Sequence, residues 1–123
     1  MTQEMISLDE TELEAAEKEA AEVLEDVYVH TFSRPFEFEG NTYDKLYFDF
    51  GSLTGRDSLA IENELSALGK PVVVRELSAE YQIRVAARAC DAPISADAFN
   101  AMSLRDCNKI LSKARSFLLG VTL

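Results

Sequence analysis

The feature that most constrains the fold of this chain is the concentration of aromatic residues between positions 28 and 50. Eight of the eleven Phe and Tyr residues lie in this stretch. The runs 36–39 and 46–50 alternate with period two, which is typical of β-strands. Gly40-Asn41 lies between them and is a common turn signal. Pro35 suits the start or the edge of a strand. The stretch 29–50 therefore predicts an aromatic β-hairpin.

The register of this hairpin is constrained by the apolar pattern. A two-residue Gly40-Asn41 loop would pair Phe38 with Tyr43, and it would put the apolar side chains of the two strands on opposite faces. One bulge or a three-residue loop returns them to a common face. We therefore predict an irregularity near residues 40–45, which a regular two-residue loop would refute.

Four helices are expected after the hairpin, at about 55–68, 79–90, 96–102 and 104–119. Polar residues at their starts predict N-terminal caps: Thr54 with Asp57, Ser78, Ser95, and Ser103 with Asp106. Gly69 and Gly120 are expected to end the first and last helix. The β-branched stretch 71–75 fits a short strand or an extended connector equally well.

Apolar spacing within these helices predicts the side chains that face the core. The expected stripes are Leu59, Leu65 and Leu68 in the first helix; Ile83, Ala86, Ala87 and Cys90 in the second, with Tyr81, Val85 and Ala89 beside them; Phe99 and Met102 in the third; and Leu104, Cys107, Leu111, Ala114 and Leu118 in the last, widened by Ile110 and Phe117.

Charge divides the chain into two parts. The formal net charge is −10, and residues 1–26 contribute −9 of it, with ten acidic residues and one basic residue, Lys18. These residues contain no Gly, Pro or aromatic residue, and Ser7 with Glu10 fits a capping box, so a helical arm is expected. The predicted organisation is an acidic helical arm at 1–27 and a single α+β domain at 28–123. The expected fold is thus an N-terminal acidic helix, one aromatic hairpin, and a small bundle of three to four helices.

Composition also excludes several classes of function. The acidic balance disfavours non-specific binding to nucleic acid or to anionic lipid. No apolar run approaches the length of a membrane helix, and the N-terminus lacks the features of a signal peptide. Two cysteines are too few to staple a secreted scaffold, which makes a reducing cytoplasm the expected location. The expected partners therefore include neither nucleic acid nor membrane.

No catalytic, metal-binding or cofactor-binding pattern emerges from the residues. The single histidine, His30, is expected to be structural or solvated. Cys90 and Cys107 fit small buried residues better than a redox or zinc pair. Close acidic pairs occur, such as Asp44 with Asp49 and Glu62 with Glu64, but spacing alone does not make them an acid–base pair. We expect a binding module rather than an enzyme, with no cofactor.

Six basic residues lie on the polar faces expected for the later helices: Arg84, Arg88, Arg105, Lys109, Lys113 and Arg115. The simpler interpretation is a solvated face that balances nearby acids. The alternative is a basic patch that meets an acidic partner, which could be the chain's own arm.

Several short motifs are shared with a known family. They are Pro35 to Gly40 followed by Tyr43-Asp44-Lys45-Leu46-Tyr47-Phe48, the helix start at 54–57, the Ala-rich helix 85–90, the segments 94–99 and 102–106, and the C-terminal run 110–120. Over residues 29–120 this arrangement resembles the small tail assembly chaperones of long-tailed bacteriophages and prophages. The arm has no counterpart in that pattern.

The resemblance implies a function without catalysis. Proteins of that family bind the tape measure protein, keep it from aggregating and help to recruit tail tube subunits. It further implies self-association, the host bacterial cytoplasm as location, and absence from the mature virion. Candidate partner contacts are the hairpin residues Tyr43 and Tyr47 and the C-terminal Phe117, Leu118 and Leu119, because aromatic and apolar side chains anchor interfaces. The alternative is that these side chains belong to the core.

Two other functions are consistent with the sequence. A secretion-type chaperone or a regulatory binding adaptor would also be small, acidic and α+β. A small enzyme would have to rely on carboxylates, and a deep pocket with convergent carboxylates would be its signature.

Overall fold

A computed structural model describes residues 26–120, and the fold is α+β as expected. The elements are strands β1 (Val27–Phe38) and β2 (Asn41–Asp49), the short 3-10 helix η1 (Phe50–Ser52), helix α2 (Gly55–Ala67), the 3-10 helix η2 (Arg75–Leu77), and helices α3 (Ala79–Ala89), α4 (Ala96–Ala101) and α5 (Leu104–Leu118). The four helices agree with the expected ranges to within one residue. The predicted arm at 1–27 and its capping box lie outside the described residues, apart from its last two positions.

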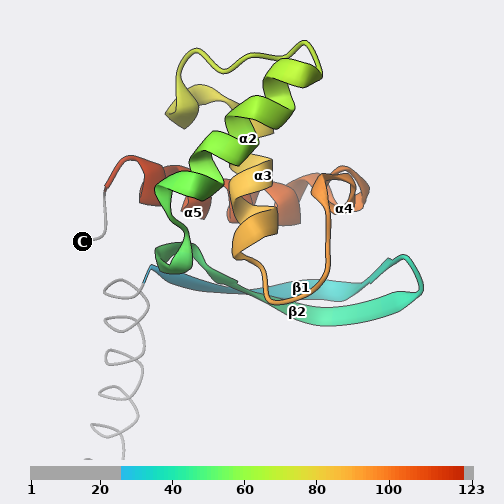
Figure 1. Cartoon of the computed structure of the whole chain (residues 1–123). Coiled ribbons are helices and arrows are strands. Elements are labelled where there is room, and N and C mark those ends of the chain that lie inside the picture. Colours follow the sequence, from blue (N-terminus) through green and yellow to red (C-terminus); the bar gives the residue numbers. More distant parts are fainter. Residues whose placement is uncertain (1–25, 121–123) are drawn as a thin grey trace, which may run out of the picture.

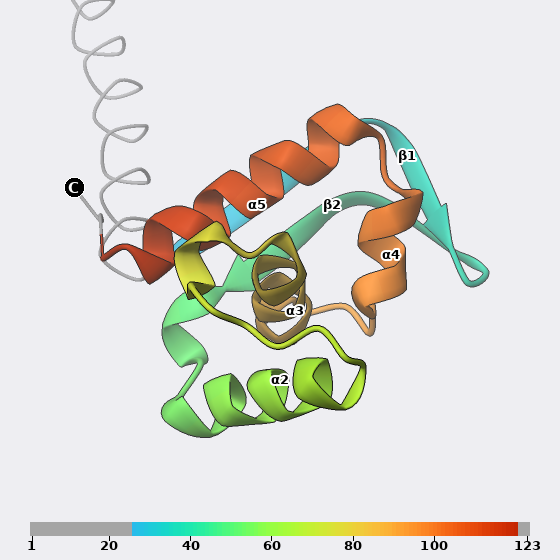
Figure 2. The ribbon, with the colours of Figure 1, turned by 90° about the horizontal axis from the view of Figure 1, so that it is seen from above.

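The hairpin forms one layer and the helices form the other (Figure 1). Helix α5 runs alongside β1, and α3 is packed between α5 and α2 (Figure 2). The segment after α3 returns to the edge of β2, where Cys90 forms an isolated bridge with Phe48 and the Asp91 amide donates to the Tyr47 carbonyl. The helices thus cover one face of the sheet.

The predicted location of the hairpin irregularity is wrong. The loop is a regular two-residue turn, Glu39-Gly40, and both residues have positive φ, +50° and +84°. This turn pairs Phe38 with Asn41. Gly40 therefore occupies the second position of the turn, where a left-handed conformation is required, and not the first position, where a Gly40-Asn41 loop would place it. The register shift lies instead in β1, between Thr31 and Phe36, where four residues including Pro35 oppose Asp44 alone.

The irregularity nevertheless has the predicted effect, because apolar side chains of both strands lie on a common face. Phe32 stacks on Phe36, and Phe36 stacks on Phe38, with ring centroids 5.2 and 6.2 Å apart. Phe48 stacks on Phe50 at 6.1 Å. Aromatic side chains from both strands therefore contribute to the core beneath the helices.

Most predicted helix ends are confirmed. The Asp57 carboxylate accepts from the Thr54 amide, and Ser78 and Ser103 accept from amides three residues later. Gly69 and Gly120 have φ of +75° and +73° just beyond α2 and α5, the conformation that glycine adopts most easily. Ser95 occupies the N-cap position of α4 as predicted, but its side chain makes no capping hydrogen bond. The stretch 71–74 is an extended connector and not a strand.

The core stripes need three corrections. In α2 the buried residues are Ile61 and Leu65, whereas Leu59 and Leu68 are exposed. In α3 the buried residues are Tyr81, Gln82, Val85, Ala86 and Ala89. The centre of the buried face therefore lies on the residues predicted to flank the stripe, and of the predicted stripe only Ala86 is fully buried. In α5 Leu104 is 76 % exposed, and Ile110 and Ala114 occupy the centre of the buried face. Phe99 and Met102 face the core as predicted.

Candidate functional site

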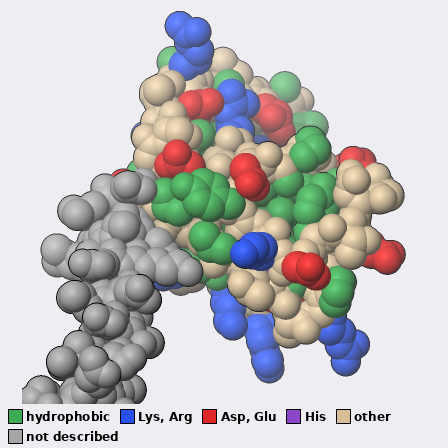
Figure 3. All heavy atoms as spheres, turned by 90° about the horizontal axis from the view of Figure 1, so that it is seen from below, with side chains coloured by type: hydrophobic (Ala, Val, Ile, Leu, Met, Phe, Trp, Pro, Cys, Tyr) green, Lys and Arg blue, Asp and Glu red, His purple; other side chains and the backbone are tan. Residues whose placement is uncertain are grey.

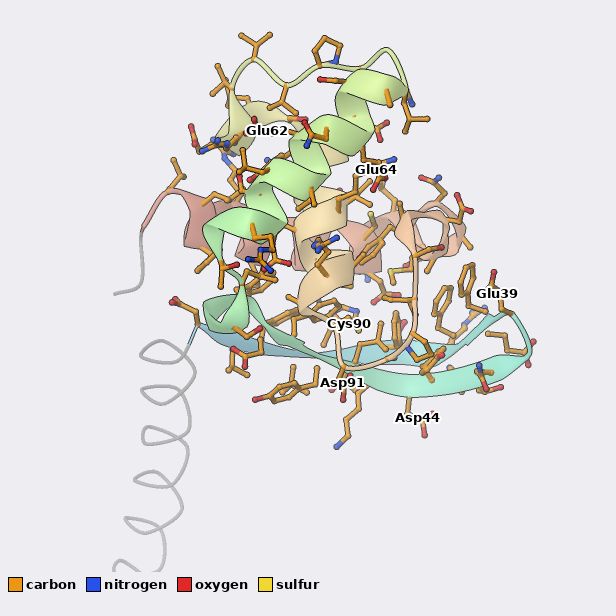
Figure 4. The ribbon with its side chains drawn as sticks, viewed as in Figure 1. Glu39, Asp44, Glu62, Glu64, Cys90 and Asp91 are labelled. Atoms are coloured by element: carbon orange, nitrogen blue, oxygen red, sulfur yellow. The ribbon has the colours of Figure 1, made fainter. Side chains whose placement is uncertain are left out.

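The acidic pairs singled out in the sequence do not converge. Glu62 and Glu64 point to different sides of α2, and Asp44 projects from the far face of the sheet (Figure 4). Glu62 is paired with Arg75, and Glu64 is paired with Arg84. Within residues 26–120, no group of three His, Cys, Asp or Glu side chains could hold a metal ion. These carboxylates therefore act in ion pairs or face solvent.

His30 is a structural residue that ties β1 to α5. It is 1 % exposed, and its Nε2 lies 2.8 Å from Asp106 Oδ1. The Tyr28 hydroxyl is 2.8 Å from His30 Nδ1, and the Ser103 hydroxyl donates to the second Asp106 oxygen. Because the carboxylate accepts, Nε2 carries the hydrogen. The Ser103 hydroxyl faces Asp106 and not the imidazole, so the chain of contacts does not activate the serine as a nucleophile.

The charge of Asp106 is stabilised by these contacts. Burial alone would raise the pKa of this carboxyl group, but the hydrogen bonds from Ser103 and His30 and the nearby Lys109 outweigh it and lower the pKa below its usual value. The carboxylate thus stays ionised at neutral pH and holds the start of α5 against the strand.

Both cysteines are half-buried and free. Burial raises the pKa of the Cys90 thiol to about 11, and burial also raises the pKa of Cys107. Thiols with raised pKa values are poor nucleophiles at neutral pH. This supports the interpretation of the two residues as small packing side chains.

The five predicted contact residues fall in two separate places. Tyr43 is half-buried against Phe36 near the hairpin turn, and Tyr47, which is 40 % exposed, lies on the sheet face opposite α3 and α5. Seen from that side, hydrophobic side chains form patches among acidic and basic ones (Figure 3). The sequence grouped these tyrosines with the C-terminal residues, but the structure does not bring the two sets together.

The C-terminal residues border a hollow that we call the C-terminal groove. It lies where the start of α2, η2 and the end of α5 meet, and it has a volume of about 260 Å³. Phe117 is stacked on Phe50 at 5.6 Å, Leu118 packs against the core, and Leu119 is half exposed beyond them. The lining residues are Leu53, Thr54, Asp57, Ser58, Ile61, Arg75, Glu76, Tyr81, Val85, Phe117 and Leu118.

Exposed apolar side chains continue from this groove along the connector before α3. Val73 is 93 % exposed and Leu77 is 71 % exposed. A second, more polar hollow lies beside Val72, Val73 and Val74 and shares Arg75 and Glu76 with the C-terminal groove. None of these side chains was among the predicted contact residues, although three consecutive valines in a stretch that is too short to be a core strand were an available signal.

Basic side chains fall into two groups. On the α2–α3 side, the pairs are Arg75–Glu62, Arg84–Glu64, Arg84–Glu80, Arg88–Asp57 and Lys70–Glu80. On α5, none of Arg105, Lys109, Lys113 and Arg115 forms an ion pair with a carboxylate of the described residues. The balanced face predicted from the sequence therefore holds for Arg84 and Arg88, and the unbalanced patch remains on α5.

Comparison with known proteins gives no match: no family model, no curated protein and no solved structure matches this chain. In the part of the chain that the structure describes, no helix has both the length and the apolar character needed to cross a bilayer.

Proposed function

We propose that this protein is a phage tail assembly chaperone that binds the tape measure protein, keeps it soluble and helps to recruit tail tube subunits. The observation that carries the proposal is the C-terminal groove together with the exposed apolar side chains beside it. A chaperone for a helical client needs an apolar surface that its own core leaves uncovered. The family resemblance of residues 29–120 supplies the identity of the client.

The groove suits a helix with apolar residues on one face. Phe117, Leu118 and Leu53 are its apolar lining residues at the end of α5 and before α2. The exposed Leu77 and Leu119 directly follow the lining residues Glu76 and Leu118 in the chain. Arg75 and Glu76 add one charge of each sign at the junction of the two hollows. An apolar centre with a polar border is the usual anatomy of a protein interface.

The net charge supports the same function. A chain at −10 repels its own copies and opposes the aggregation of a complex that it coats. Binding through an apolar groove and solubility through acidic charge then belong to different parts of the chain.

The test is co-expression with the tape measure protein of the same genome. The full chain is expected to raise the soluble fraction of the client and to co-purify with it. Leu77→Asp is expected to abolish both effects, because it places a charge on the apolar surface. Leu104→Asp is the matched control: Leu104 is equally exposed but lies at the far end of α5, where an acidic residue is compatible with a helix start.

An insoluble client with no complex would overturn the proposal. An equal loss of client solubility in the two variants would show that the groove is not the binding surface. Gene neighbourhood separates the proposal from the alternative of a secretion-type chaperone or a regulatory adaptor. A tail tube gene upstream and a tape measure gene downstream are expected.

A further inference from the structure

Helix α5 carries a row of basic side chains on the side away from the core. Arg105, Lys109 and Lys113 are spaced four residues apart, which places them on one side of the helix over about 12 Å. All three are exposed. We call this row the α5 ridge. Lys and Arg side chains project from the edge of the molecule along which α5 runs (Figure 3).

In the described part of the chain, no carboxylate forms an ion pair with the ridge, although Asp106 is near enough to Lys109 for the lysine charge to lower its pKa. The one acidic residue of α5, Asp106, is buried and is held by His30 and Ser103. On the side of β1, Lys113 Nζ lies 5.5 Å from the centroid of the Tyr28 ring. Elsewhere, Arg34, Lys45 and Arg56 also form no ion pair with a described carboxylate, and they come from β1, β2 and α2 and so do not form a row.

The chain itself supplies a complementary segment. Residues 1–25 contain nine acidic residues and one basic residue, a net charge of −8. They join the domain at Asp26, whose carbonyl accepts from the Phe50 amide, and Tyr28 follows two residues later beside Lys113. The acidic segment is therefore attached next to one end of the ridge. A short tether of this kind gives an effective concentration in the millimolar range.

We propose that residues 1–25 bind the α5 ridge of the same chain. Opposite charges and the point of attachment both favour this contact, and no acidic side chain of the described residues forms an ion pair with the ridge. The contact covers the basic side of α5 and leaves the C-terminal groove open. This inference does not depend on the identity of the client and stands separately from the proposed function.

The test is zero-length carbodiimide cross-linking of the full chain, which joins carboxylates to lysines only at ion-pair distance. An equal mixture of ¹⁴N- and ¹⁵N-labelled chains distinguishes links within one chain from links between two copies. We expect unmixed links from residues 1–25 to Lys109 and Lys113, several-fold more abundant than links from the same segment to Lys45 or Lys70. The Lys70–Glu80 pair serves as the internal control for the reaction.

Salt and a matched pair of variants sharpen the result. Links to the ridge are expected to be lost between about 0.1 M and 1 M salt, since the screening length falls from about 10 Å to about 3 Å. Arg105→Glu is expected to reduce them several-fold, although Arg105 cannot itself be cross-linked. Arg56→Glu, at the same position of α2, is expected to leave them unchanged.

Equal links to Lys45 and the ridge would overturn the proposal, as would an absence of links at Lys109 and Lys113. Links that join light and heavy chains would show that a second copy is the occupant and would also overturn it. Circular dichroism of both Glu variants checks that α5 and α2 remain folded.

Discussion

The two sides of the helical layer use charge in opposite ways. On the α2–α3 side, basic side chains are joined to acidic ones across helices, and Arg84 alone links Glu64 and Glu80. On α5, the one acidic residue is turned inward to His30, and the basic residues face outward without ion pairs in the described chain. The first arrangement is complete within the domain, whereas the second leaves charge for another segment or molecule to neutralise.

The difference separates structural charges from available ones. A closed network of ion pairs contributes to stability and offers little to a partner, because binding would first have to break it. Unpaired side chains contribute almost nothing to stability and keep their full attraction for an opposite charge. Mutations on the two sides should therefore change different measurements.

The largest effect is expected at the inward charge of α5. Asp106→Ala leaves the buried His30 and the hydroxyl of the exposed Ser103 without their shared acceptor, so the free energy of unfolding should fall by about 3 kcal/mol. Urea denaturation measures this loss in the free energy of unfolding. Asp97→Ala, which removes an exposed acid from the first turn of α4, should change stability by less than about 0.5 kcal/mol. Equal losses would mean that the buried contact has no special role.

The same carboxylate should give stability a pH dependence. Because the pKa of Asp106 is lowered in the folded state, its contribution is present above the unfolded pKa of about 4 and is lost as pH falls through the folded pKa. The stability difference between the wild type and Asp106→Asn should therefore shrink on acidification below about pH 4. Denaturation series at several pH values would contradict this if the difference stayed constant.

A smaller effect on stability should distinguish the ion-paired basic residues of α3 from the basic residues of α5 that have no ion pair in the described chain. Arg84→Ala removes two ion pairs of a largely buried side chain and should lower stability by about 1 kcal/mol, after allowance for its half-exposed partners. Lys109→Ala should change stability by less than about 0.3 kcal/mol. Thermal denaturation of both variants checks this contrast, and a loss at Lys109 as large as at Arg84 would erase it.

The smallest effect on stability is expected from deletion of residues 1–25. The core cluster is built from residues between Tyr28 and Leu118, and contacts between exposed charges add little to the stability of a fold. The shortened chain should therefore unfold cooperatively, with a midpoint within a few degrees of the full chain. Loss of the cooperative transition would place the arm within the core.

Much of the fold could be predicted because its signals are local. Helix boundaries followed from Thr54, Ser78, Ser103 and the glycines, and the hairpin followed from alternating aromatics. The register could not be chosen because Gly40 can occupy either position of a two-residue turn. A signal for the true bulge was present in Ser33-Arg34-Pro35, three poor strand residues between two inward-facing phenylalanines.

Faces and sites depend on packing between distant segments, which a single sequence does not encode locally. Helix α2 has leucines on two sides, and contact with α3 decides that Leu65 is buried and that Leu59 is not. The pairing of His30 with Asp106 spans 76 positions and had no local signal. The C-terminal groove likewise needs η2 and α5 to meet, so only its Phe117–Leu119 side could be named in advance.

The proposed contacts lie on the C-terminal groove and on the α5 ridge. The ion pairs that join α2 to η2 and α3 take no part in them, apart from those of Arg75 and Asp57 at the groove. Hydrogen–deuterium exchange of the full chain, alone and in the co-purified complex with the tape measure protein, distinguishes these surfaces. We expect slower exchange in the complex at residues 71–77, at the start of α2 as far as Ile61, and at the C-terminal end of α5, with no change in the rest of α2. Protection spread along the ion-paired faces of α2 and α3, or no complex to measure, would contradict it.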